Sequence, residues 1–171
     1  MMHIYYGDGK GKTTAAVGLA VRAVGRGFRV LFVQFLKSED SGERTTLSQL
    51  DNITLTPCPL ELDFTFNMND AQKLQASKIF RNIFDSAVKT ALTEKYDMLI
   101  LDEVFSAIET EMLKESEVYS FLANAPNNME IVLTGNNPPE SILSLADYVS
   151  HIVKEKHPYD KGISARKGIE Y

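Results

Sequence analysis

Residues 7–14 read Gly7-Asp8-Gly9-Lys10-Gly11-Lys12-Thr13-Thr14, and this stretch is the most informative part of the chain. A short apolar run at residues 4–6 precedes it, and a long apolar segment at residues 15–24 follows it. The pattern predicts a phosphate-binding loop between a strand and a helix. The glycines let several backbone N–H groups point at one phosphate, Lys12 adds a positive charge and the Thr13 hydroxyl can ligate Mg²⁺. A glycine-rich turn that binds nothing is the disfavoured alternative. We therefore expect a nucleotide-binding protein, although Tyr6 stands where the first glycine of such loops usually lies.

The composition of the chain indicates one globular domain in a reducing compartment. The chain has 171 residues, of which 44% are hydrophobic, enough for a single domain over residues 1–171 to bury a core. Its net charge of −5 argues against a general nucleic-acid binder, since no positive field would attract the phosphate backbone. Cys58 is the only cysteine, which excludes an internal disulfide and a cysteine-based metal site. The first strand begins too early for a signal peptide, and no apolar run approaches the roughly 20 residues that cross a bilayer. We expect a cytoplasmic protein without membrane contact.

Strand-like and helix-like segments alternate along the chain, which predicts an α/β fold with a mostly parallel sheet flanked by helices. The expected strands are at residues 4–6, 30–35, 53–56, 98–101, 131–133 and 148–153. The expected helices are at residues 13–24, 69–91, 115–122 and 141–146, with a loop or short helix within 37–51. The nearly continuous apolar content of the first helix predicts burial on several sides. Asn69 and Gln72 fit a capping box at the start of the longest helix.

A second motif with ionisable side chains lies at residues 98–103, where a buried strand ends in Asp102 and Glu103. Ligands of open α/β sheets lie at the carboxyl ends of strands, so at least one of these acids is expected to hold Mg²⁺ opposite the Thr13 hydroxyl. The residues leave open which acid contacts the metal, and Asp102 could instead cap the following segment. Gln34 and Lys37 close the second strand and could line the same crevice. For Lys37, an exposed loop position fits the sequence equally well.

The C-terminal segment 154–171 has no periodicity, but it keeps proline, glycine and aromatic residues at positions that suggest a fixed path. A terminus without such residues is usually disordered. We expect this tail to fold over a binding site. His157 lies in the tail, where a lone histidine is more often a surface residue than a ligand.

Further motifs follow the first loop in order along the whole chain. They are Val33-Gln34-Phe35-Leu36-Lys37, Leu101-Asp102-Glu103, Leu133-Thr134-Gly135 with Asn137-Pro138-Pro139, Ala146-Asp147, Lys156-His157-Pro158-Tyr159 and Lys167-Gly168-Ile169-Glu170-Tyr171. The set resembles the corrinoid adenosyltransferases of the BtuR/CobO type. The resemblance implies a RecA-like P-loop NTPase fold and transfer of the 5′-deoxyadenosyl group of ATP to Co(I) of a reduced corrinoid. Triphosphate would be the other product, Mg²⁺ the cofactor, and adenosylcobalamin biosynthesis or salvage the pathway.

The resemblance also implies roles for particular residues. The loop from Gly7 to Thr14 would bind the phosphates, and the catalytic residues would be Lys12, Thr13 and Glu103. The ligands of Mg²⁺ would be Thr13 with Asp102 or Glu103. Phe64 and Phe66 fall in a segment that lies near the corrin in this family and helps to displace the lower axial ligand; core packing is the alternative for both rings. His157 is expected at the binding site. The implied partners are a second copy of the chain, in a homodimer, and a flavoprotein reductase that supplies Co(I).

The chain departs from the family pattern in three places. Phe66 stands where tryptophan is usual, Asn136 replaces a common arginine, and the chain starts at its first strand without the N-terminal arm of many relatives. Two alternatives therefore stay open. One is an ordinary P-loop ATPase, in which Glu103 polarises water for attack on the γ-phosphate. The other is a non-catalytic relative that binds corrinoid and ATP.

Overall fold

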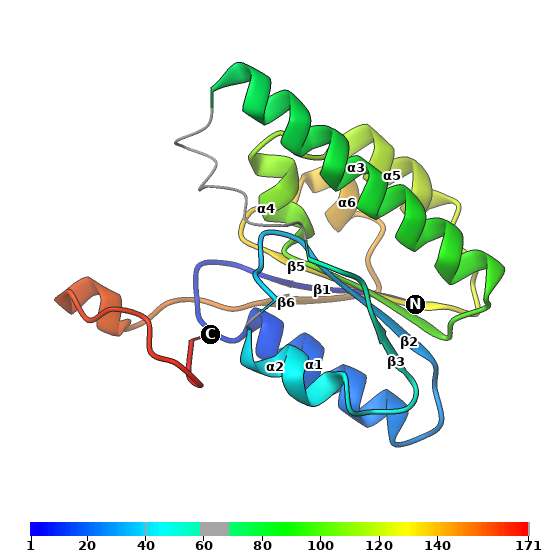
Figure 1. The fold of residues 1–171 in the computed structure, drawn as a ribbon, viewed down its shortest axis with the longest axis horizontal. Helices are drawn as coiled ribbons and strands as arrows, with labels where there is room; N and C mark the ends of the chain where they lie inside the picture. The colour runs from blue at the N-terminus through cyan, green and yellow to red at the C-terminus, as the bar shows by residue number, and fades with distance from the viewer. Residues whose placement is uncertain (40, 59–68, 171) are drawn as a thin grey trace.

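The protein contains one six-stranded sheet in which all described strand pairings are parallel (Figure 1). The computed structural model describes residues 1–39, 41–58 and 69–170. The strands are β1 (Met2–Tyr6), β2 (Val30–Gln34), β3 (Ile53–Leu55), β4 (Met98–Asp102), β5 (Glu130–Gly135) and β6 (Tyr148–His151). Their order across the sheet is β3-β2-β4-β5-β1-β6. The predicted α/β fold with a parallel sheet is confirmed.

Helices cover both faces of this sheet (Figure 1). One face carries α1 (Lys12–Val24) and α2 (Gly42–Leu47). The other carries α3 (Asp70–Thr93), α4 (Val104–Glu109), α5 (Glu115–Ala123) and α6 (Glu140–Leu143). Alternate residues of a strand point to opposite faces, so Val33 and Leu101 join the core under α3, whereas Phe32 and Ile100 join the core over α1. The continuous apolar runs of β2 and β4 follow from this burial on both faces.

The topology brings three strand ends together. β5 lies between β1 and β4, and all three strands run parallel. The loop of residues 7–11 follows β1, Glu103 follows β4 and Asn136 follows β5. Because the carboxyl ends of parallel strands meet at one edge, segments far apart in the sequence converge there.

The burial predicted for the first helix on several sides is wrong. Of the residues in α1, only Ala16, Ala20 and Ala23 are buried. Gly18 is exposed and the Val21 side chain remains 47% exposed. Small side chains at a spacing of three to four residues let one side of the helix pack closely on the sheet, and the other side faces outward.

Most other elements lie within two or three residues of their predicted positions. The capping box of α3 is confirmed: Asn69 Oδ1 accepts from Gln72 N at 2.9 Å, and Gln72 Oε1 accepts from Asn69 N at 2.8 Å. The short helix α4 was not predicted, because it has no side-chain cap and starts after Glu103, whose φ of 60° is left-handed. The tail contains one turn of 3₁₀-helix (Pro158–Lys161), with the His157 side chain accepting from Tyr159 N. None of the described helices is both long enough and apolar enough to cross a membrane.

Candidate functional site

The glycine-rich loop is held against the ends of two neighbouring strands. Gly7 N donates to the carbonyl oxygens of Gly135 and Asn136, at 3.3 and 3.1 Å, and Gly9 N donates to Ile152 O at 2.9 Å. A Cβ on Gly7 would lie 2.4 Å from Ile152 O, and the φ of Gly7 is +116°. This position therefore requires glycine. One residue earlier, the Tyr6 ring stacks on His151 with centroids 4.5 Å apart, so a side chain is accommodated where other loops of this kind have glycine.

The loop ends at the start of α1 with Lys12 and Thr13. Lys12 Nζ donates to Gly9 O at 3.0 Å, so the ammonium group lies against the loop that it belongs to. Thr13 Oγ1 donates to Asp102 Oδ1 at 3.0 Å, which joins the loop to the end of β4. The predicted proximity of Thr13 to the acidic motif is thus present in the structure.

Asp102 is fully buried at the centre of a polar network. Besides Thr13, its carboxylate accepts from Thr134 Oγ1 at 2.6 Å and from Gln34 Nε2 at 3.2 Å. Burial raises the pKa of the Asp102 carboxyl, and the hydrogen bond from Thr134 opposes this shift. All three donors are neutral. A cation nearby would therefore relieve a real electrostatic cost.

Glu103 lies one residue beyond the strand and faces the loop cavity. Its backbone N donates to Thr134 Oγ1 at 2.9 Å, and its Oε2 accepts from Ser106 Oγ at 2.6 Å. The left-handed backbone at Glu103 is uncommon for a residue with a side chain and turns the chain sharply at the end of β4. The two acids therefore have different surroundings: Asp102 is enclosed, and Glu103 lines open space.

Two adjoining cavities lie along this edge of the sheet. The first, of about 240 Å³, is lined by Asp8, Gly9, Lys10, Gly11, Lys12, Thr13, Thr14, Lys37, Glu103, His157, Ile169 and Glu170. The second, of about 340 Å³, is lined by Thr13, Thr14, Val17, Lys37, Gly42, Glu43, Gly168, Ile169 and Glu170. A larger basin of about 840 Å³ lies over α4, α5 and α6 and includes no predicted site residue. The convergence of charged groups from separate strand ends points to the two smaller cavities as the candidate site.

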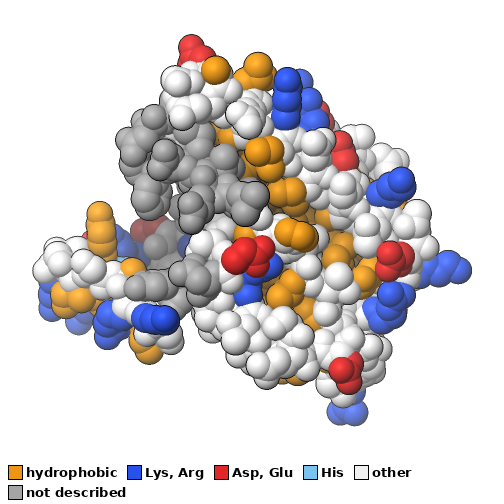
Figure 2. Space-filling view, viewed as in Figure 1, with side chains coloured by type: hydrophobic (Ala, Val, Ile, Leu, Met, Phe, Trp, Pro, Cys, Tyr) orange, Lys and Arg blue, Asp and Glu red, His pale blue; other side chains and the backbone are white. Residues whose placement is uncertain are grey.

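The tail contributes directly to these cavities. Lys154 N donates to Asp8 Oδ1 at 2.9 Å, and this hydrogen bond lowers the pKa of the Asp8 carboxyl. Glu170 pairs with Arg166 at 2.9 Å, which lowers its pKa to about 2. Figure 1 shows the chain projecting to the left and returning towards the start of α1, and Figure 2 shows basic side chains gathered on this projection. The tail therefore lies beside the loop and brings His157 to the same cavity.

The structure thus brings together the predicted loop residues, Asp102, Glu103 and His157. Phe64 and Phe66 lie outside the described residues. Sequence reasoning missed Glu170, although it falls in the final quoted motif. It also missed Arg44, a buried arginine in α2 that sits in an otherwise polar stretch and carries no local signal. Lys37, left undecided by the sequence, lines both cavities.

The oxygen donors at this site suit Mg²⁺. Among the described residues, no group of three or more His, Cys, Asp or Glu side chains forms a ready-made metal site. Mg²⁺ is usually held by one or two carboxylates together with substrate phosphates, and it prefers hydroxyl, carboxylate and water oxygens. Thr13, Asp102 and Glu103 fit that requirement, since the buried Asp102 carboxylate has only neutral donors around it.

The buried carboxylate predicts a pH dependence of stability. Because the pKa of Asp102 is raised in the folded state, its contribution to the free energy of unfolding is complete below its ordinary pKa of 3.8 and is lost as the pH rises through the raised value. Asp102→Asn removes this titration. We therefore expect the variant to lose less stability than the parent as the pH rises from 3.8 through the raised pKa of the Asp102 carboxyl. Urea unfolding at a series of pH values, without nucleotide or Mg²⁺, measures the difference. Parallel pH profiles for the two proteins would contradict the expectation.

Comparisons with known proteins identify relatives of the whole chain. A family model described as "ATP:corrinoid adenosyltransferase BtuR/CobO/CobP" matches residues 1–171. The chain is 34% identical to "Corrinoid adenosyltransferase" of Escherichia coli (strain K12), over 98% of the chain and 84% of that protein. It is 33% identical to "Corrinoid adenosyltransferase CobA" of Salmonella typhimurium, with the same coverage of both chains.

The fold is also similar to that of solved ATPase structures. Thermomonospora curvata EccC (ATPases 2 and 3), solved in complex with a signal sequence peptide, matches with a TM-score of 0.55 and 14% identity. The match covers 93% of this chain and 32% of that one, so the chain spans about a third of the solved protein. At this identity the likeness shows the P-loop ATPase fold alone.

Proposed function

Since the chain belongs to the family of ATP:corrinoid adenosyltransferases, we propose that it transfers the 5′-deoxyadenosyl group of ATP to Co(I) of a reduced corrinoid and releases triphosphate. The observation that carries this proposal is the cavity shared by the glycine-rich loop, Glu103 and the tail. It offers backbone N–H groups and lysines for the phosphates at the end of a sheet where ligands of this fold class bind.

The proposed reaction is a displacement at carbon. Co(I) attacks C5′ of ATP, a Co–C bond forms, and the C5′–O bond breaks with its electron pair leaving on the triphosphate. Cobalt is oxidised from Co(I) to Co(III) in this step. Co(I) is a strong nucleophile without help, so the protein has two tasks: to hold C5′ over cobalt and to stabilise the charge on the departing triphosphate.

The chain's own residues suit the second task. The N–H groups of the loop from Gly7 to Thr13 and the Lys12 ammonium would hold the phosphate oxygens. Thr13, with Glu103 or Asp102, would hold Mg²⁺, which neutralises part of the triphosphate charge when it is bound. The enclosed position of Asp102 favours contact through Thr13 or water, and the open position of Glu103 favours direct contact.

Other parts of the proposal concern the corrinoid and the partners. Phe64 and Phe66 would crowd the lower face of the corrin and keep an oxygen or nitrogen ligand away from cobalt. A homodimer, a flavoprotein reductase that supplies Co(I) and a cytoplasmic location complete the proposal. A reducing compartment suits a Co(I) substrate and a chain with one cysteine.

An anaerobic assay tests this function against its alternatives. The protein is incubated with Mg·ATP and chemically reduced cob(I)alamin while the corrin spectrum is followed and the phosphate product is identified. We expect a light-sensitive adenosylated corrinoid and an equal amount of triphosphate. Orthophosphate with an unchanged cob(I)alamin spectrum would instead identify an ATPase in which Glu103 polarises water. Corrinoid binding without either product would identify a non-catalytic relative.

A further inference from the structure

A sharp turn after β2 places a third lysine at the phosphate cavity. Phe35 is fully buried, and its backbone N donates to Asp102 O at 3.0 Å, so the chain is anchored at that point. The next residue, Leu36, has a φ of 52°, a left-handed conformation that residues with a side chain rarely adopt. Lys37 follows and lines both adjoining cavities. An uncommon backbone conformation of this kind persists only where its surroundings impose it.

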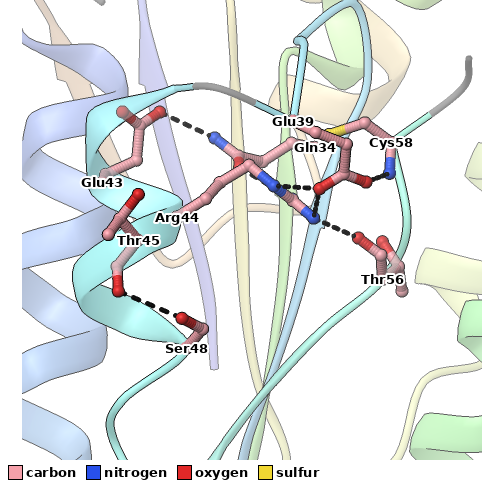
Figure 3. Close-up of polar contacts among 8 residues, drawn as sticks. All are labelled: Gln34, Glu39, Glu43, Arg44, Thr45, Ser48, Thr56 and Cys58. Carbon is pink, nitrogen blue, oxygen red and sulfur yellow. Dashed lines mark hydrogen bonds and ion pairs between the residues drawn. The ribbon is translucent and has the colours of Figure 1, made fainter.

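The contacts that impose this backbone conformation come from Arg44 in α2 (Figure 3). Its Nη1 donates to Gln34 Oε1 at 3.1 Å, on the near side of the turn. Its Nε donates to Glu39 Oε2 at 3.0 Å, on the far side. Its Nη2 also donates to Thr56 O at 2.9 Å, and the other oxygen of Glu39 accepts from Cys58 N at 2.6 Å. The Arg44 side chain is only 7% exposed, whereas that of Glu39 is 56% exposed, so the buried arginine holds both ends of the turn through charge-assisted and forked hydrogen bonds.

The Lys37 ammonium is available for a ligand. It makes no hydrogen bond or ion pair with any part of the chain that the structure describes, whereas the acids nearby have partners. Glu43 accepts from Gln34 Nε2 at 3.0 Å, and Glu170 pairs with Arg166. Glu103 accepts from Ser106 but still lines the same cavity as Lys37. Of these three acids, Glu170 alone is paired with a cation, because Gln34 and Ser106 are neutral donors. Lys37 therefore brings a positive charge to cavities that Glu43 and Glu103 also line. Burial raises the pKa of the nearby Asp102 carboxyl, and the Lys37 charge opposes this shift.

We propose that Lys37 binds the polyphosphate of the nucleotide together with the lysines of the glycine-rich loop, and that Arg44 is a positioning residue that holds the turn presenting Lys37. Lys10 and Lys12 follow β1, whereas Lys37 follows β2, with β4 and β5 between these strands. The cations thus approach the cavity from different strand ends. This inference rests on the proposed function in one respect, which is that the triphosphate leaves as a unit. The negative charge that develops on it is then spread over three phosphates, and one lysine of the loop cannot reach all of them.

Binding of inorganic tripolyphosphate tests the role of Lys37 without corrinoid or chemistry. Titration calorimetry at fixed ionic strength compares the parent with Lys37→Met, which keeps a long apolar stem, and with Lys78→Met, which removes the same charge from an exposed position on α3. We expect Lys37→Met to weaken binding by about 10- to 100-fold, the value of a charge-assisted hydrogen bond, and Lys78→Met to leave it unchanged. Lys37→Arg should recover part of the loss. A change below about threefold for Lys37→Met would overturn the proposal.

The positioning role of Arg44 is tested by a double-mutant cycle. Arg44→Lys keeps the charge but cannot make the forked contacts, and Glu39→Gln is a milder change on a half-exposed partner. If Arg44 acts through Lys37, each change weakens tripolyphosphate binding in the parent but has little effect in the Lys37→Met background. Equal losses in both backgrounds would show a general structural role and overturn this part. Thermal unfolding of each variant comes first, and Glu39→Gln carries the test if Arg44→Lys does not fold.

The two proposals fail in distinguishable ways. Tripolyphosphate binding that depends on Lys37, without formation of an adenosylated corrinoid, would support the inference and remove the proposed function. Adenosylation with normal activity in Lys37→Met would keep the function and remove the inference. In the transfer assay we expect Lys37→Met to lower kcat as well as raise KM for ATP, because the triphosphate gains charge in the transition state.

Discussion

Replacing Lys12 by alanine is expected to lower the rate of adenosyl transfer by roughly 10²- to 10³-fold. Lys12 is the one lysine at the junction of the loop and α1, and its Nζ already lies 3.0 Å from Gly9 O, within the ring of groups that would surround a phosphate. In water a single ammonium group contributes little, but in a lined cavity it acts on charge that develops during the reaction. The measurement is the initial rate of formation of the light-sensitive adenosylated corrinoid under strong chemical reduction.

The fold of the Lys12→Ala variant should be unaffected. Lys12 is half-exposed and makes one hydrogen bond, so the free energy of unfolding should change by less than about 1 kcal/mol. Thermal unfolding of both proteins provides this control. A variant that folds normally and keeps more than about a tenth of the parent rate would contradict the assignment of Lys12 to the phosphates.

Replacing Gly135 by alanine is expected to destabilise the protein by about 3–5 kcal/mol. An added Cβ would lie 2.6 Å from Cβ of Phe105, and the φ of Gly135 is +146°. Phe105 is fully buried in α4, so it cannot move aside without disturbing the core. Gly135 O also accepts from Gly7 N, and the damage should therefore reach the glycine-rich loop. Urea unfolding measures the loss as a lower midpoint with an unchanged slope.

Gly18→Ala provides a matched control for the same chemical change. Gly18 is exposed in the middle of α1, and a Cβ there meets nothing within 4 Å. Alanine is favoured over glycine in a helix, so this variant should gain about 0.5–1 kcal/mol. Similar free energies of unfolding for Gly135→Ala and Gly18→Ala would contradict this prediction. They would show that the fold does not require the close approach of Gly135 to Phe105.

Much of the architecture could be predicted from local patterns. The strand, loop and helix at the N-terminus were predicted from a glycine-rich stretch that ends in Gly11-Lys12-Thr13 and lies between two apolar runs. A phosphate-binding loop needs glycines for its tight backbone and a lysine for its positive charge. The capping box at Asn69 was predicted for the same reason: its hydrogen bonds join residues three positions apart. The burial of α1 was not predicted correctly, since apolar content does not show which side of a helix meets a sheet. Val21, although apolar, lies on the outward side.

Local patterns along the chain are enough to predict which residue types are available for phosphate and metal, and that strands alternate with helices. The tertiary structure decided how those residues are used. Thr13 and Asp102 are 89 positions apart, and only the parallel order of β1, β5 and β4 brings their side chains to 3.0 Å. That packing also encloses Asp102 while Glu103 remains at the cavity, and it allows Arg44 to hold the turn that presents Lys37. Local patterns follow from the backbone geometry of neighbouring residues, whereas burial, charge pairing and access to a ligand depend on which distant segments pack together.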